Sequence, residues 1–156
     1  MSAALDAVTS AGVPHRVVRH EPARSLTEAA ERQGIEVRDV AKTIVVRRGD
    51  GDFVFVLVPG DRVISWPKLR TLLGVNRLSM PDAATAREAT GYERGTITPF
   101  GSSTAWPVIA DERLRGRRIN LGSGERGVGI QVRAEDAVSA LDATFADVTD
   151  PEPVRS

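Results

Sequence analysis

Apolar residues are grouped in short runs along this chain, and the clearest runs have the spacing of strands. Two β-branched runs, at 43–47 and 53–58, are separated by the polar turn 49–52. A short polar turn between two such runs predicts a β-hairpin. Both runs are apolar at consecutive positions, as in strands that are covered on both faces. Shorter runs predict further strands at 15–20, 77–80, 107–110, 119–121, 128–132 and 145–148.

Capping and stop signals place helices between these strands. Ser25 and Glu28 have the spacing of a capping box, and Gly34 follows as a C-cap glycine. Ser65 opens another helix, in which Pro67 is tolerated in the first turn. These signals predict helices at 3–11, 25–34, 65–73, 82–90 and 134–141, and a turn of helix at 111–114.

The chain shows no internal repeat and no linker-like segment. Strands and helices are therefore expected to share one core, in a single α/β domain over residues 1–150 with a mixed sheet and flanking helices. Residues 151–156 are expected to form a flexible C-terminal tail. Residues 91–106 have no clear periodicity and predict a long loop, and loops of this length in compact domains are usually functional.

Composition narrows the chemistry. The 156 residues carry 21 cationic and 21 anionic side chains, so no global basic field attracts nucleic acid, and local patches would have to hold it. The absence of Cys excludes disulfides and thiolate chemistry. The two His do not have the spacing of metal ligands, so no metal site is expected, and no cofactor is expected either.

No apolar run approaches a membrane span of about 20 residues, and the start does not have the pattern of a signal peptide. A cytoplasmic protein is expected.

Lys42 is the most informative single residue. Only Lys42 and Lys68 are lysines, and every other cationic side chain is an arginine. Lys42 stands at the start of the first hairpin run, and burial shifts the pKa of a lysine readily, whereas an arginine keeps its proton. It is therefore a candidate site residue. The alternative is a lysine whose stem covers apolar surface while its ammonium reaches water.

Three separated motifs occur in order along the chain. They are Ala41-Lys42-Thr43 before an apolar strand, T-G-Y-x-x-G-x-x-x-P-x-G at 90–101, and G-x-R-G at 124–127. Together with the closing segment 143–148, they resemble the YbaK/ProX family of aminoacyl-tRNA editing deacylases over nearly the whole chain. The resemblance implies a mixed α/β domain, partly barrel-like, that acts free-standing or inserted in prolyl-tRNA synthetase.

The resemblance also implies the activity, which is hydrolysis of the ester between a wrong small amino acid and the 3′ adenosine of tRNA. Mischarged aminoacyl-tRNA and prolyl-tRNA synthetase would then be the expected partners. Lys42 matches the family's functional lysine, and 95–99 matches its G-x-x-x-P loop. The expected catalytic residues are accordingly Lys42, Gly95, Thr96, Ile97, Thr98 and Pro99.

Ester hydrolysis fits these residue types. Gly95 lets the backbone approach a substrate closely, and Pro99 stiffens the loop so that amides can be held in place. One aimed N–H on a developing oxyanion contributes about 3–4 kcal/mol to lowering the barrier. With no Cys and no His in a recognisable nucleophile pairing, water is expected to be the nucleophile. The expected substrate-binding residues are His20, Thr43, Gly101, Gly122 and Ser123.

Plainer interpretations of several residues remain open. His20 fits a surface position at a strand end, and Ser123 fits an ordinary hairpin turn. The densest basic cluster, expected to meet tRNA phosphates, also fits a solvated loop, because Asp111 and Glu112 lie beside it. Its members are Arg113, Arg115, Arg117 and Arg118.

Three positions depart from the cysteine-specific members of the family. Those members tend to have Tyr where this chain has Val18, and Ser and Asp where it has Gly122 and Gly129. The departures suggest another amino-acid preference or weakened catalysis. The departures at Gly122 and Gly129 favour a first rival function, a tRNA-end or small-ligand binding module without turnover. A second rival is a subunit or accessory module that recruits a synthetase through a surface helix.

Overall fold

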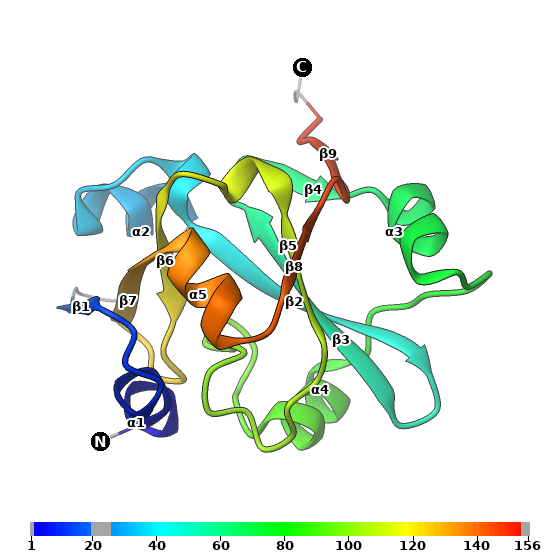
Figure 1. Ribbon diagram of the computed structural model, residues 1–156, viewed down its shortest axis with the longest axis horizontal. Coiled ribbons are helices and arrows are strands. Elements are labelled where there is room, and N and C mark those ends of the chain that lie inside the picture. The colour runs from blue at the N-terminus through cyan, green and yellow to red at the C-terminus, as the bar shows by residue number, and fades with distance from the viewer. Residues whose placement is uncertain (1, 20–25, 154–156) are drawn as a thin grey trace.

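A computed structural model describes residues 2–19 and 26–153, and its centre is a four-stranded mixed sheet (Figure 1). The strand order is β2-β3-β5-β8, in which β2 and β3 are antiparallel and the other neighbours are parallel. The strands are β2 Ala41–Gly49, β3 Asp52–Pro59, β5 Val108–Asp111 and β8 Thr144–Ala146. The β2–β3 pair is the hairpin that the two apolar runs predict.

Two smaller antiparallel sheets flank this centre. One has the order β1-β7-β6, and the other pairs β4 with β9. Their strands are β1 His15–Arg19, β6 Arg118–Gly122, β7 Val128–Arg133, β4 Arg62–Ile64 and β9 Thr149–Pro151. The α/β class with a mixed sheet is confirmed. The partly barrel-like closure is not found, because the sheets stay separate.

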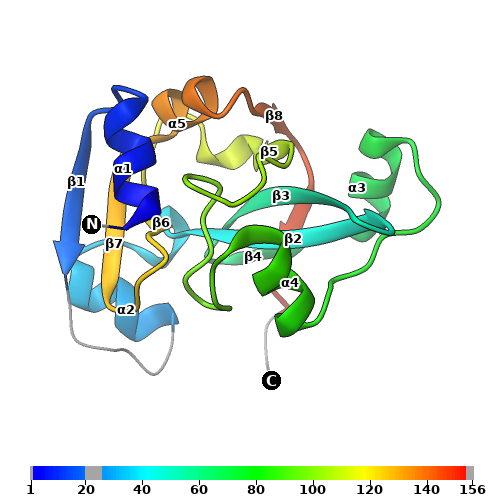
Figure 2. The ribbon, with the colours of Figure 1, turned by 90° about the horizontal axis from the view of Figure 1, so that it is seen from below.

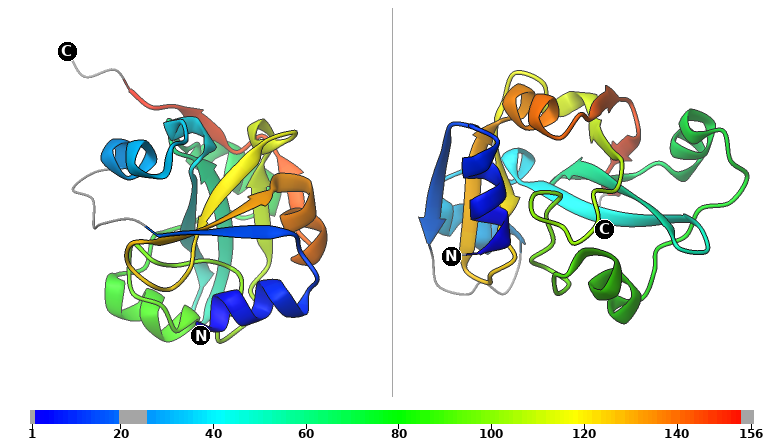
Figure 3. Two further views of the ribbon diagram at one scale, coloured as in Figure 1. Left: turned by 90° about the vertical axis from the view of Figure 1, so that its left-hand side faces the viewer. Right: turned by 60° about the horizontal axis from the view of Figure 1, so that its bottom comes forward.

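Short helices cover the sheets. The loop 91–106 passes between the β1-β7-β6 sheet and the β2–β3 hairpin, and α3 lies at the far end of the molecule (Figures 2 and 3). The helices are α1 Ala3–Ser10, α2 Leu26–Gln33, α3 Trp66–Leu73, α4 Ala83–Thr90 and α5 Ala134–Ala140, with 3₁₀ turns η1 Val37–Asp39 and η2 Glu112–Leu114. No helix among the described residues is long and apolar enough to cross a membrane.

Strand β3 has a hydrophobic cluster on each face, because alternate residues of a strand point to opposite sides. Phe53, Phe55 and Leu57 belong to one cluster, and Val54 and Val56 belong to the other. The edge strand β2 is only partly buried. The consecutive apolar pattern therefore describes β3 better than β2.

Local differences from the expected elements have simple causes. Residues 77–80 do not form a strand; a single bridge joins Ser79 to Arg47, and Pro81 follows soon after without an N–H to extend the pairing. The closing strand ends at Ala146, and β9 follows it and pairs with β4. Neither β4 nor β9 has a sequence signal, because each is three residues long. The Ser25 cap and His20 lie outside the described residues.

Candidate active site

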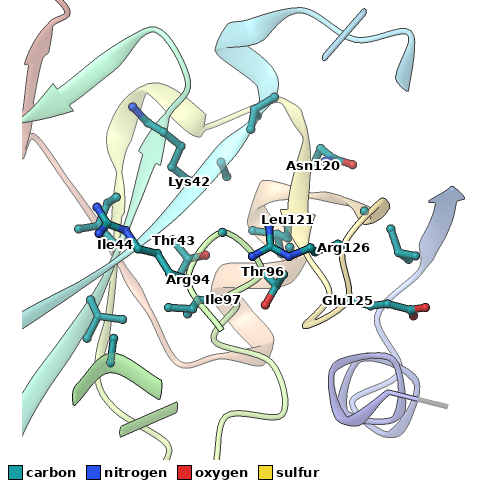
Figure 4. A pocket seen from close by; sticks show the side chains of 18 of the residues that line it. Lys42, Thr43, Ile44, Arg94, Thr96, Ile97, Asn120, Leu121, Glu125 and Arg126 are labelled. Carbon is teal, nitrogen blue, oxygen red and sulfur yellow. The ribbon is translucent and has the colours of Figure 1, made fainter. Parts of the chain in front are cut away.

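A cavity of about 510 Å³ opens between the edge of β2 and the β6–β7 hairpin (Figure 4). This volume is within the range of small-molecule sites. The loop segment 94–97, which lies between the two sheets, lines the cavity. Residues of the segment 80–86 form another part of its wall. The cavity therefore brings together Lys42, the G-x-x-x-P loop and the G-x-R-G turn, which are far apart in sequence.

The edge of β2 is open where it faces the cavity. Besides its ladder with β3, β2 has one bridge from Arg47 to Ser79, and the adjoining Val40 has one to Asn120 on β6. The residues between these bridges, 42–45, line the cavity. An unpaired strand edge offers backbone N–H and C=O groups to a ligand. The cavity thus lies at the place where β2 and β6 do not pair, which is also why the sheets do not close into a barrel.

The G-x-x-x-P loop is braced at both of its ends. Gly124 N–H donates to the carbonyl of Thr96 (2.8 Å), and Thr96 Oγ1 donates to the carbonyl of Glu93 (2.7 Å). At the far end, the Tyr92 hydroxyl donates to the Phe100 carbonyl (2.7 Å). Buried Thr96 and Thr98 fix the centre of the loop. Such bracing holds the loop backbone in one shape.

Two cavity-lining residues of this loop have N–H groups that the protein leaves unused. The N–H groups of Gly95 and Ile97 have no hydrogen-bond partner within residues 2–19 and 26–153, and both residues line the cavity. Gly95 has φ +90°, a conformation that other residues rarely adopt. That these amides are aimed at a substrate stays a prediction.

Gly122 lies directly under the loop. A Cβ built there would be 2.8 Å from the Ile97 carbonyl oxygen and 2.9 Å from that of Thr96. The glycine therefore lets the loop rest on β6. Gly101 has a similar packing reason outside the cavity, because a Cβ there would lie 2.5 Å from the Ala3 backbone.

Ser123 has its hydroxyl engaged within the β6–β7 turn. Its Oγ is 2.8 Å from the Val128 carbonyl oxygen and accepts from Glu125 N–H (3.2 Å). It is buried and does not line the cavity. This geometry is that of the plain hairpin turn.

Lys42 lines the cavity and is half-buried. Its Nζ donates to the Arg62 carbonyl (2.7 Å), and in Figure 4 the ammonium points away from Thr96 and Ile97. Burial lowers the pKa of Lys42, while Glu152 and Asp61 raise it to a lesser extent. The ammonium must swing away from Arg62 to reach a group bound at the loop.

Two buried polar atoms in the cavity wall have no partner among the described residues. They are Thr43 Oγ1 and Asn120 Oδ1. Buried polar atoms are nearly always hydrogen-bonded in proteins, so each calls for an explanation such as a ligand. Thr43 was expected at the site, whereas Asn120 was missed. The sequence feature that could have indicated Asn120 is a side-chain amide between two apolar residues of the strand Arg118–Gly122.

The three departures from the cysteine-specific pattern form one row across a sheet. Val18 is the cross-strand partner of Gly129, and Gly129 is the partner of Gly122. Gly122 and Gly129 line the cavity. Val18 does not line it, although it is the strand neighbour of Gly129.

The predicted basic cluster lies away from the cavity lining. Arg113 donates to Asp147 (2.8 Å), whose hydrogen bond raises the pKa of Arg113, and also faces buried Asp111. Arg115 packs over the Phe145 ring at 4.3 Å, and Arg117 reaches the Arg38 carbonyl (3.3 Å). Arg118 is exposed. Their contact with tRNA stays a prediction.

Within the described residues, no group of three or more His, Asp or Glu could hold a metal ion. The groups that the cavity offers are instead backbone amides, hydroxyls, one side-chain amide, three cations and the carboxylate of Glu125.

Residues 20–139 match the sequence profile of the aminoacyl-tRNA editing domain. The chain belongs to this family. The resemblance of the three motifs to editing deacylases is thereby confirmed.

Two groups of relatives are similar to the chain. A protein of Enterococcus faecalis, EbsC, named as a candidate Cys-tRNA(Pro)/Cys-tRNA(Cys) deacylase, is 29% identical over 129 residues, which are 82% of this chain and 79% of that protein. The proline–tRNA ligase of Thermosipho melanesiensis is 32% identical over 101 residues, or 64% of this chain but only 18% of the ligase. The chain thus corresponds to a small part of these synthetases.

Solved structures agree with the fold. A candidate trans-editing enzyme for prolyl-tRNA synthetase has a TM-score of 0.84 and 27% identity, with 93% of each chain covered. The hypothetical protein APE2540 has a TM-score of 0.86 over 94% of this chain and 98% of its own, and at 24% identity it supports the fold alone.

Proposed function

We propose that this protein is an aminoacyl-tRNA deacylase that acts in trans and hydrolyses the ester of a mischarged small amino acid on tRNA. The observation that carries the proposal is the pair of unused amides, Gly95 and Ile97, on a braced loop in the wall of the cavity. Membership of the editing-domain family supports the same reaction class.

The reaction follows from what the cavity holds. A water oxygen attacks the ester carbonyl carbon, and the carbonyl electrons move to its oxygen. The amides of Gly95 and Ile97 stabilise this oxyanion, and because they are held before the reaction they lower its barrier. Collapse of the tetrahedral species breaks the bond to the ribose oxygen, which leaves with a proton. Lys42 supplies positive charge on the carbonyl side once it leaves Arg62.

The cavity wall favours small acyl groups. The loop rests on Gly122, and Gly129 lies beside it, so the wall is rigid and shaped by backbone. Large side chains are excluded by overlap with groups that have little room to yield. Discrimination among small side chains is weak, because one methylene changes binding by about 1–3 kcal/mol.

The test is side-by-side deacylation of Ala-, Ser-, Cys- and Leu-charged tRNA. We expect turnover of the three small esters and little of the Leu ester. Val18 stands where Cys-specific relatives have Tyr, so the preference for Cys over Ala should stay below about a hundredfold. Fastest turnover of the Leu ester would contradict the small cavity, and a Cys preference above a hundredfold would contradict the argument from Val18.

A second candidate is a tRNA-end binding module without turnover. The row of Val18, Gly129 and Gly122 favours it, because the polar groups of the cysteine-specific members are absent there. Binding of charged tRNA without hydrolysis of any of the four esters would select this candidate.

We also propose the tRNA, the synthetase and the cellular location. Relatives of this domain occur within prolyl-tRNA synthetases. We infer that tRNA(Pro) charged with the wrong amino acid is the substrate, that prolyl-tRNA synthetase is the source of these errors, and that the protein acts in the cytoplasm.

A further inference from the structure

Two arginines of the cavity lining have no protein partner. Neither Arg94 nor Arg126 has an ion pair or hydrogen bond to any described residue. Some arginines outside the lining are engaged; Arg48, for example, bonds Asp52 (2.9 Å) and Arg113 bonds Asp147 (2.8 Å). Others outside the lining, such as Arg16 and Arg133, also have no hydrogen bond or ion pair to a described residue, so what sets Arg94 and Arg126 apart is their place in one cavity. In a chain with equal numbers of cations and anions, unpaired guanidinium groups in one cavity are a local excess of positive charge.

The two side chains come from different segments. Arg94 precedes the G-x-x-x-P loop, and Arg126 belongs to the β6–β7 turn. Arg126 Nη1 is 3.8 Å from the position that a Cβ on Gly95 would occupy. In Figure 4, Arg126 reaches toward Thr96 and Arg94 toward Ile44, so the two groups lie on either side of the loop.

The single carboxylate of the lining does not neutralise them. Glu125 lies 4.0 Å from Arg19, outside the cavity lining, and in Figure 4 it points away from Arg126. With Lys42, the lining carries three cationic side chains against this one carboxylate. The lining therefore carries an excess of positive charge.

The substrate class decides which anion would meet this charge. An amino acid esterified to tRNA has no free carboxylate, and its α-amino group is at least partly protonated near neutral pH. Guanidinium groups repel that end. The anions of the substrate are its phosphodiesters, and the planar fork of arginine matches phosphate oxygens in pairs.

We propose that Arg94 and Arg126 bind the two phosphodiesters nearest the 3′ end of the tRNA, while the loop and Gly122 receive the aminoacyl ester. This assignment rests on the proposed function. It places a phosphate site at the mouth of the cavity, apart from the cluster at 113–118.

The first test measures binding of an uncharged acceptor-stem RNA with a single-stranded CCA end. We expect Arg94→Ala and Arg126→Ala each to weaken binding about tenfold. The double variant should reduce the slope of log affinity against log salt by about 1.4, since each phosphate contact on a single strand contributes about 0.7. The matched control is Arg16→Ala with Arg133→Ala, which removes two exposed arginines outside the cavity lining. An effect of the control as large as that of the cavity variant would overturn the proposal.

The second test changes the RNA. Neutral methylphosphonates replace the last two phosphodiesters, which should weaken binding by the wild-type protein but leave the double alanine variant unaffected. Equal losses for both proteins would mean that the arginines do not touch these phosphates.

A variant with Arg94→Lys and Arg126→Lys keeps both positive charges but lacks the planar guanidinium fork. It should retain the salt slope and lose affinity several-fold. This lysine variant also serves if the alanine variant fails to fold.

These measurements use uncharged RNA and do not need turnover. If no charged tRNA is hydrolysed yet the arginines and phosphates are coupled, the proposed function fails and the phosphate site stands. If hydrolysis occurs without this coupling, the phosphate site fails alone. When both hold, the alanine variants should raise KM much more than they lower kcat, because the contacts are made before and during the reaction alike.

Discussion

At the scale of single residues, Lys42 shows how one side chain connects the cavity to the rest of the molecule. Its Nζ bonds the carbonyl of Arg62, and the Arg62 guanidinium bonds Thr149 Oγ1 (2.7 Å). Thr149 in turn donates to buried Asp111 (2.8 Å). The resting position of the ammonium is thus set by β4 and β9, which the sequence alone did not reveal.

Lys42→Ala should abolish most deacylation and leave the fold intact, because the change removes a charge at the cavity and no core side chain. Single-turnover deacylation and a thermal melt measure the two effects. Lys68→Ala is the matched control, since Lys68 is the other lysine and is bonded to Asp147 and Thr149 outside the cavity. A normal melt with wild-type deacylation by the Lys42 variant would refute its role.

The pH dependence follows from the lowered pKa of Lys42. If the ammonium is the active form, activity falls as pH rises through this pKa, which lies below that of a free lysine. Glu152 raises the pKa of Lys42, so Glu152→Gln should lower it further and move the alkaline fall in kcat/KM to lower pH. The pH profile is measured with the spontaneous hydrolysis of the ester subtracted. An unmoved alkaline limb would assign it to another group.

At the scale of elements, the loop 95–99 rests on Gly122 of β6, and Gly129 lies beside Gly122 in the cavity wall. The loop keeps its shape because of hydrogen bonds at both ends and because Gly122 gives it space. Its function is therefore sensitive to backbone conformation more than to side-chain chemistry.

Gly95→Val should lower the single-turnover rate more than it weakens tRNA binding. A β-branched residue is strained at φ +90°, and the adjustment displaces the amides that we propose stabilise the transition state. Gly51→Val is the control, because Gly51 has a similar φ of +65° in an open turn outside this cavity lining. Equal losses of rate and binding across a concentration series would show that the loop only binds.

Sequence patterns predicted the elements well where local signals are strong. The hairpin 41–59, the helix capped by Ser65 and the loop 91–106 depend on turn residues, caps and apolar runs, and these are local. Strands β4 and β9 escaped prediction because three residues carry no period. Asn120 and Arg126 were missed as site residues because their importance arises from which strands and turns face each other, and single-sequence patterns do not contain that information.

At the scale of the whole molecule, charge is balanced, and several cations in the described part of the chain are paired locally. Few phosphates can then be neutralised, so the dependence of tRNA affinity on salt should be shallow. A log–log slope of roughly −2 to −4 is expected, against about −10 for a heavily basic surface.

Arg115→Ala with Arg117→Ala should reduce this slope by about one to two if the cluster at 113–118 meets tRNA phosphates. The same salt series on wild type and variant measures it. An unchanged slope would leave the phosphate contacts to the cavity arginines, and changes in both double variants would mean that tRNA spans both surfaces.

The seam between β2 and β6 also bears on how this protein could be engineered. Among the residues that the structure describes, a single bridge crosses it, from Val40 to Asn120. A variant selected purely for resistance to heat would gain by extending that single bridge into a full ladder, since each added backbone hydrogen bond stabilises by about 1 kcal/mol. The same change would fill the cavity entrance with paired strands. Directed evolution toward thermostability should therefore be screened for deacylation at every round. Pairing β2 with β6 is the most direct way to stabilise the protein, and it would also close the cavity between these strands.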